Sequence, residues 1–234
     1  MKLSNQDIYD RIYAAISERR LLPGTKLSEE RLAQAFHASR TRVREVLLRL
    51  SQELIVQSHP NRGAFVASPT QEDMHHVFAV RRALERAIAA ELSERFGGRA
   101  IAPLRGHLER EAKARAAGDR AALARLTGDF HIRLAETTGN RIFSDNLRRL
   151  VALTGLIIAQ YDAQASSACP EHEHEDIVKA IEAGDAKRAE RLMLQHLEHV
   201  EHGIQPPEAI SSEVNFERIF GVGDIPPAYK PRRA

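Results

Sequence analysis

The region from residue 69 to residue 203 most strongly constrains the fold of this 234-residue chain, because its apolar residues recur at helical spacing. Glycine, proline and polar residues interrupt that spacing at short intervals, and no strand-like run follows Thr70. The pattern predicts helices over residues 70–96, 103–117, 119–138, 140–165, 171–183 and 185–203. The sequence therefore predicts an all-α bundle here and a mostly α fold class for the whole chain.

The first 68 residues show a different pattern. Helical spacing predicts helices over residues 4–21, 29–36 and 39–50, with serines at positions suited to cap them and a tight turn between the last two. Two β-rich runs follow, "ELIVQS" and "GAFVAS", and the intervening "HPNR" predicts a hairpin loop. Short helices across a turn followed by a hairpin are typical of a winged helix-turn-helix domain, which we expect over residues 1–68.

This amino-terminal region holds the excess positive charge. It carries eleven basic residues against seven acidic ones, a net charge of +4, whereas the whole chain has +2. In "ASRTRVREVLLRL", residues 38–50, the Val and Leu side chains share one helical face, so the arginines of the first turn project outward. Arginine can read guanine in the major groove, and a helix amino terminus favours phosphate. We interpret this helix as DNA-binding; the alternative is a solvated basic helix face.

These residues resemble the winged-helix domain of GntR-type bacterial transcription regulators. The runs "PGTKL", "EERLA", "SRTRVREVLLRL" and "RGAFV" occur in the order and spacing of that family. The chain departs from the family at Arg42, where proline is frequent, and at "QELIV", which lacks the glycine of the usual "EGLV". The resemblance implies base and phosphate contacts by Arg40, Thr41 and Arg44 and a wing tip at Gly63, and our further candidate DNA contacts are Ser39, Arg42, Arg49 and Arg62.

Three of the eleven histidines belong to the apolar stripes of the helical region: His131, His174 and His196. A turn at Gly184 and Asp185 sets the last two nearly level in an antiparallel hairpin, so one ion could contact both. Buried neutral imidazoles need a metal, a water or an anionic ligand, unless each is bonded separately to a carbonyl group. We expect the following histidines at the surface: His75, His76, His107, His172, His199 and His202.

Residues 69–203 also resemble the FCD-type ligand-binding domain of the FadR subfamily, through "VRRALE", "FHIRLAETTGN" and "AIEAGDAKRAERLMLQHL". Metal-binding FCD domains are known for three histidines and an aspartate one turn before the first. Thr127 occupies that aspartate position here, and Asp129 is expected on the opposite side of the helix. The resemblance implies a site for Zn²⁺ or Ni²⁺ whose shell a carboxylate effector could complete.

Two residues are candidate effector contacts, Thr127 and Arg81. Arg81 matches an arginine that the family commonly places in the pocket, where a guanidinium can grip a carboxylate with two hydrogen bonds. An internal ion pair with Glu85, one turn further along, is the alternative.

These features together predict a transcription regulator, more consistent with a repressor, that binds a palindromic operator as a homodimer and responds to a small carboxylate. A metal-dependent helical enzyme with a DNA-targeting module is the alternative. We disfavour it because no acidic residue on a core stripe next to the three histidines offers a general base.

Composition adds three expectations. The chain shows neither a signal-like segment nor an apolar stretch long enough to cross a bilayer, which predicts a cytoplasmic protein without a membrane partner. Cys169 is the only cysteine, so an internal disulfide and a thiolate-rich zinc site are excluded. Residues 204–234 form a carboxy-terminal extension whose large apolar residues predict docking on the bundle or on a dimer partner.

Overall fold

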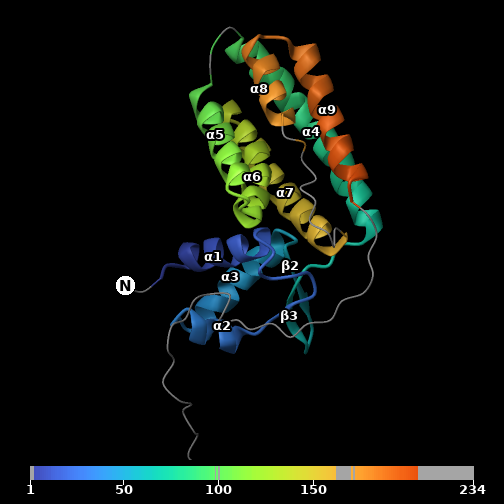
Figure 1. The fold of residues 1–234 in the computed structure, drawn as a ribbon. Helices are drawn as coiled ribbons and strands as arrows, with labels where there is room; N and C mark the ends of the chain where they lie inside the picture. Colours follow the sequence, from blue (N-terminus) through green and yellow to red (C-terminus); the bar gives the residue numbers. More distant parts are fainter. Residues whose placement is uncertain (1–2, 98, 100, 162–169, 171, 205–234) are drawn as a thin grey trace, which may run out of the picture.

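The computed structural model describes residues 3–97, 99, 101–161, 170 and 172–204. Within these residues the chain is mostly helical, and an amino-terminal winged helix-turn-helix domain lies against one end of a larger helical domain (Figure 1). The predicted fold class is therefore confirmed. Cys169 and the extension after Ile204 lie outside the described residues, as does the predicted continuation of a helix beyond Tyr161.

The amino-terminal domain contains three helices and three short strands: α1 (Asn5–Ser17), β1 (Lys26–Leu27), α2 (Glu29–Ala35), α3 (Arg40–Gln52), β2 (Val56–His59) and β3 (Gly63–Val66). Ser4, Ser28 and Ser39 cap the three helices, as the sequence predicts. The predicted hairpin is present as β2 and β3, but β1 pairs with the other edge of β3 and was missed. A strand of two residues is too short to show an alternation of apolar and polar residues in the sequence.

The missing glycine before the wing has a structural consequence at Leu54. This residue ends α3 in the left-handed conformation with φ 64°, and its side chain is 61% exposed. The backbone N–H of Leu54 donates to Ser51 and that of Ile55 to Leu50, the pairing that glycine usually supports at a helix end. The backbone therefore forms a turn that usually takes glycine, although a leucine occupies it.

We expect Leu54→Gly to stabilise the amino-terminal domain by about 0.5–1 kcal/mol. Relief of left-handed strain gains about 1–2 kcal/mol, and the greater freedom of glycine in the unfolded chain offsets about 0.5–1 kcal/mol of it. Urea denaturation measures the change. A decrease in the free energy of unfolding would show that the exposed leucine makes contacts which outweigh its backbone strain.

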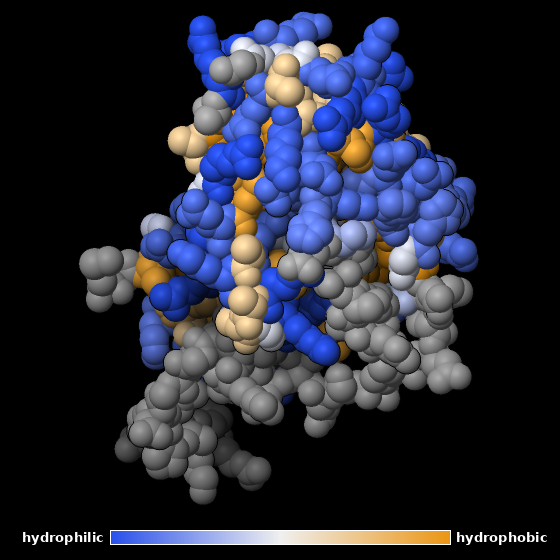
Figure 2. All heavy atoms as spheres, turned by 45° about the horizontal axis from the view of Figure 1, so that its top comes forward, coloured by the Kyte–Doolittle hydropathy of each residue, from blue (hydrophilic) through white to orange (hydrophobic). Residues whose placement is uncertain are grey.

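The helical domain consists of α4 (Gln71–Phe96), α5 (Ala102–Ala116), α6 (Arg120–Thr138), α7 (Arg141–Tyr161), α8 (Glu173–Glu182) and α9 (Ala186–His202). One continuous apolar core joins them, with Phe78 and Phe130 among its fully buried side chains. Figure 2 shows a largely hydrophilic surface on the viewed face, where apolar side chains emerge only in small groups. Among the described residues, no helix has the length and apolar character needed to cross a membrane.

Helix α7 connects the two domains physically. Its Ala152 and Leu156 are buried in the core of the amino-terminal domain, whereas Leu147 and Ile157 belong to the core of the helical domain. The hydroxyl of Tyr161 donates to the carbonyl oxygen of Pro69 in the segment between the domains. The two cores therefore share one helix, which places α1 beside α6 and α7 (Figure 1).

Candidate functional site

The amino-terminal part of α3 carries two exposed arginines, Arg40 and Arg44. The side chains of Arg40 and Arg44 are 64% and 65% exposed. Arg44 donates to Glu29 of α2 through Nε at 2.8 Å and Nη2 at 2.7 Å, while Arg40 Nη2 lies 4.0 Å from the same carboxylate. The hydrogen bonds from Arg44 lower the pKa of Glu29. Sequence reasoning missed Glu29, and the fifteen-residue separation from Arg44 gave no local signal.

The remaining candidates for DNA contact differ in their surroundings. Ser39 accepts from the N–H of Arg42 as the α3 cap, and Thr41 beside it is exposed. At the wing, Arg62 lies in the exposed turn between β2 and β3, and Gly63, the exposed first residue of β3, has a φ of 91° that favours glycine. The Arg62 guanidinium lies 5.9 Å from the centre of the Phe65 ring.

Arg42 and Arg49 instead bind their own domain. Arg42 donates from Nε to Asn5 Oδ1 at 2.7 Å and from Nη2 to the Leu3 carbonyl. Arg49 lies 3.8 Å above the ring of Tyr9 and donates to Gln6 Oε1 at 2.8 Å. Both arginines thus hold α3 to α1 or to the segment before it. The sequence pattern alone could not show whether these side chains point toward α1 or outward to solvent.

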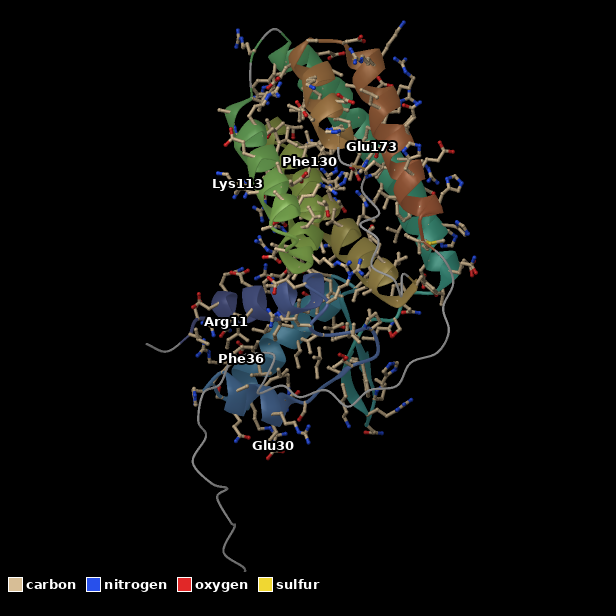
Figure 3. The ribbon with its side chains drawn as sticks, in the orientation of Figure 1. Arg11, Glu30, Phe36, Lys113, Phe130 and Glu173 are labelled. Carbon is tan, nitrogen blue, oxygen red and sulfur yellow. The ribbon has the colours of Figure 1, made fainter. Side chains whose placement is uncertain are left out.

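The three histidines predicted to converge do so in the helical domain. His131 of α6, His174 of α8 and His196 of α9 are 4%, 2% and 1% exposed. His196 Nε2 lies 3.3 Å from His131 Nε2 and 3.3 Å from His174 Nε2. The three residues form a candidate metal cluster whose ligand atoms lie within 4.8 Å of one another. Phe130, which stacks on His174, and Glu173 mark the level of this cluster in Figure 3.

A glutamate faces the other ring nitrogen of each histidine. His131 Nδ1 lies 2.5 Å from Glu85 Oε2 of α4, and His174 Nδ1 lies 2.9 Å from Glu111 Oε2 of α5. His196 Nδ1 lies 2.8 Å from Glu173 Oε2 of α8. We expected that no acidic residue on a core stripe next to these histidines offers a general base, and these three glutamates, each facing a histidine nitrogen, were not foreseen. Each glutamate comes from a different helix than its histidine, so no spacing in the sequence indicated the pair.

The charges within the cluster follow from burial and from these pairs. Burial lowers the pKa of His131 to about 3 and that of His196 to about 4, which keeps both imidazoles neutral near pH 7. Burial alone would raise the pKa of Glu85, but the nearby Arg81 guanidinium lowers it overall. Burial likewise opposes ionisation of Glu111, and hydrogen bonds from His107 and His174 outweigh it and lower its pKa. The glutamates are therefore ionised acceptors.

His107 is buried, and the expectation of a surface position is wrong. Its Nε2 lies 2.9 Å from the Leu126 carbonyl oxygen and 3.1 Å from Glu111 Oε1. A carbonyl can only accept, so Nε2–H of His107 donates, and Glu111 accepts from both His107 and His174. Sequence reasoning failed because the α5 pattern around His107 is highly charged although one face is covered by α6. The other five histidines expected at the surface are exposed.

Arg81 is 2% exposed and forms the internal ion pair with Glu85, which was one of the two sequence-based alternatives. Its Nε donates to Glu85 Oε1 at 2.7 Å, and its Nη1 donates to Thr154 Oγ1 at 3.1 Å. Its Nη2 has no partner among the described residues. A buried guanidinium nitrogen without an acceptor is costly, so an arriving anion would satisfy it.

Arg81, Thr154 and the three histidines of the cluster line one cavity of about 310 Å³, together with Thr127. The Thr127 hydroxyl donates to the carbonyl of Ala124 in its own helix, and its oxygen retains capacity to accept. Asp129 also borders the cavity. Its carboxylate accepts from Arg125 Nη1 at 3.3 Å and is not part of the histidine cluster.

Comparison with protein families divides the chain where the structure does. The family model described as "Bacterial regulatory proteins, gntR family" matches residues 4–66. The FCD domain model matches residues 76–199, more than half of the chain. The two matches cover the winged helix-turn-helix domain and the helical domain in turn.

Individual relatives are similar over most of their length. The transcriptional repressor RspR of Escherichia coli K12 is 26% identical over 205 residues, which cover 86% of this chain and 89% of that protein. A probable D-xylose utilization operon transcriptional repressor of Paenarthrobacter nicotinovorans is 28% identical, covering 81% and 84%. A crystal structure of a GntR regulator from Rhodococcus sp. RHA1 has a TM-score of 0.75 at 25% identity, covering 85% and 95% of the two chains. The E. coli protein McbR/YncC shares the fold with a TM-score of 0.72 at 20% identity, covering 84% and 94%.

Proposed function

We propose that this chain, which belongs to the GntR family of bacterial transcription regulators and carries an FCD domain, binds operator DNA as a homodimer and releases it when a small carboxylate enters the helical domain. Family membership favours a regulator over the alternative of a metal-dependent enzyme. The single observation that carries the ligand proposal is the cavity lined by the three histidines and by Arg81, whose Nη2 has no partner among the described residues.

The hydrogen-bond partners of the histidines support a divalent metal. A carboxylate facing Nδ1 fixes the proton on Nδ1, so we assign unprotonated Nε2 atoms that point at one another. Lone pairs 3.3 Å apart repel unless a cation lies between them. Two nitrogens each about 2.05 Å from a tetrahedral ion lie about 3.3 Å apart, so the cluster fits a metal such as Zn²⁺.

The identity of the ion follows from the ligand type. Imidazole nitrogens suit Zn²⁺ and Ni²⁺ better than Mg²⁺ or Ca²⁺, which prefer oxygen. Thr127 contributes no charge, unlike the aspartate usual at its position, so three protein ligands leave positions open. A bound carboxylate can supply both the oxygen and the negative charge, while Arg81 Nη2 donates to its second oxygen. Metal and effector should therefore strengthen each other's binding.

The proposal of a homodimeric repressor has separate support. One α3 helix reads only a few base pairs, and a two-fold dimer presents two such helices to a palindromic operator. Two of the relatives described above are named as repressors. Sedimentation of the protein with and without DNA tests the dimer, and transcription from its target promoter with and without the gene tests the direction of control.

Thr127→Asp tests the metal proposal directly. We expect this variant to bind Zn²⁺ and Ni²⁺ at least about tenfold more tightly than the parent, because a charged oxygen ligand is added beside the three imidazoles. Isothermal titration calorimetry without any carboxylate measures the affinity. Thr137→Asp is the matched control, since it adds the same charge to α6 at a residue that does not border the cavity. Equal affinities in parent and Thr127→Asp would contradict a metal site at this position.

A further inference from the structure

His107 is a buried histidine that lies outside the three-histidine cluster. Its side chain is 0% exposed, where α5 packs against α6. Burial of an imidazole costs free energy unless its ring nitrogens find hydrogen-bond partners, whereas a leucine fills similar space without that requirement. The partners of His107 therefore indicate what the imidazole contributes at this position.

Two contacts fix which ring nitrogen of His107 carries the proton. Arg110 Nη2 lies 3.3 Å from Nδ1 of His107, and a guanidinium can only donate, so Nδ1 accepts. Nε2 of His107 lies 2.9 Å from the carbonyl oxygen of Leu126 on α6, which can only accept. We therefore assign the proton to Nε2, which acts as the donor.

The same Nε2–H reaches Glu111, the glutamate that faces one of the proposed metal ligands. His107 Nε2 lies 3.1 Å from Glu111 Oε1. His174 Nδ1 lies 2.9 Å from Glu111 Oε2 and 3.2 Å from Oε1. The carboxylate is thus held between two imidazole donors. Because rotation of Glu111 away from His174 would also break the hydrogen bond from His107, the latter restricts how Glu111 meets His174.

Helix α4 has the same arrangement at another histidine of the cluster. Arg81 Nε donates to Glu85 Oε1 at 2.7 Å, and Glu85 Oε2 faces His131 Nδ1. In both helices the donor precedes the glutamate by four residues, which places the two side chains on one helical face. His107 therefore occupies in α5 the position that Arg81 occupies in α4.

We propose that His107 is a positioning residue of the metal site, which holds Glu111 so that His174 presents its Nε2 to the ion. This inference rests on the proposed function and adds a residue that does not line the cavity. In the present orientation of its ring, His174 Nε2 lies 3.3 Å from His196 Nε2. Without the hydrogen bond from His107, Glu111 can turn and the ring of His174 can follow it, so the spacing that suits one ion is lost.

Two substitutions separate the hydrogen bond of His107 from its packing. His107→Gln keeps an N–H donor near the position of Nε2, whereas His107→Leu keeps only the bulk. We expect His107→Leu to weaken Zn²⁺ binding about tenfold and His107→Gln to stay within about threefold of the parent, as measured by isothermal titration calorimetry. With Co²⁺ in place of Zn²⁺, the visible absorption spectrum of the bound ion should change in His107→Leu and match the parent in His107→Gln.

A double-variant cycle tests whether His107 acts through Glu111. In the Glu111→Gln background, His107→Leu should weaken Zn²⁺ binding by less than about a further twofold, because the carboxylate that it positions is already lost. Urea denaturation of the metal-free proteins shows that each variant is folded and gives the cost to folding separately. If His107→Leu does not fold, His107→Met replaces it, since methionine adapts to irregular core space and equally lacks an N–H donor.

Leu104→Val is the matched control. Leu104 is a fully buried residue on the same helix, and its shortening perturbs the packing of α5 without removing a hydrogen bond. This variant should lower the stability of the metal-free protein, yet its Zn²⁺ affinity should stay within about twofold of the parent.

Three results would overturn the positioning role while the metal proposal stands. The first is a Zn²⁺ affinity of His107→Leu within twofold of the parent, and the second is an equal loss of affinity in His107→Gln. The third is the same tenfold loss with Glu111 present and with Glu111→Gln, which would show that His107 acts by packing alone. Failure of the parent itself to bind Zn²⁺ would refute both the metal proposal and this inference.

Discussion

His196→Ala is expected to abolish measurable Zn²⁺ and Ni²⁺ binding. His196 is the central member of the cluster, because its Nε2 lies 3.3 Å from the Nε2 atoms of both His131 and His174. Its loss removes one of three protein ligands from a site that already lacks the aspartate, so two imidazoles remain. His174→Ala should behave alike. Calorimetric titration of each purified protein with the two metals measures the effect.

Two further variants test whether the loss of metal binding is specific to the histidine cluster. His202→Ala removes an exposed histidine from the same helix and should bind metal as the parent does. Glu111→Gln keeps the shape of a side chain that accepts from His174 but removes its charge, and should weaken metal binding about 10–100-fold. Circular dichroism confirms that each variant is folded. Metal binding by folded His196→Ala at parental affinity would assign the histidines a purely structural role.

Metal removal should also destabilise the helical domain. At a free metal concentration of 100 times Kd, binding contributes about 2.7 kcal/mol to the native state. Chelation removes that contribution and leaves the three Nε2 lone pairs facing one another. Denaturation with metal and with chelator, compared between parent and His196→Ala, should show a difference only in the parent.

The double variant Arg40→Ala/Arg44→Ala is expected to lose about 2–6 kcal/mol of operator binding free energy, the sum of about 1–3 kcal/mol for each base-reading arginine. Both side chains are exposed near the amino-terminal end of α3. The ion pair between Arg44 and Glu29 does not prevent Arg44 from binding DNA, because an exposed ion pair contributes only about 0–1 kcal/mol to stability. DNA can therefore displace Glu29 at small cost.

Electrophoretic mobility shift with operator and with unrelated DNA of equal length measures the loss. Arg141→Ala/Arg188→Ala is the control, since it removes the same charge from exposed positions of the helical domain. Arg42→Ala and Arg49→Ala should act instead through domain stability, because both arginines bind residues at or before α1. Operator affinity of the Arg40→Ala/Arg44→Ala protein equal to that of the parent would show that another surface reads the DNA.

The sequence by itself determined the helices, the β2–β3 hairpin and their order, although not β1. Helix caps at Ser4, Ser28 and Ser39, the apolar stripes and the hairpin signal are local features, with interactions spanning only a few residues. Local spacing also placed His131, His174 and His196 on core faces, and the turn at Gly184 fixed the level of two of them. That much of the site could be predicted because helix geometry converts sequence distance into position.

Only the tertiary structure decided which side chains contact one another across different helices. Glu85, Glu111 and Glu173 contact histidines from other helices, and Arg42 and Arg49 turn toward the amino-terminal end of their domain. His107 became buried because α6 covers its side of α5. Such contacts depend on how helices rotate and approach one another across tens of residues, which no local pattern encodes. The cavity has the same origin, because packing of α7 against both cores brings Tyr13 of α1 to the wall that Arg81 also lines.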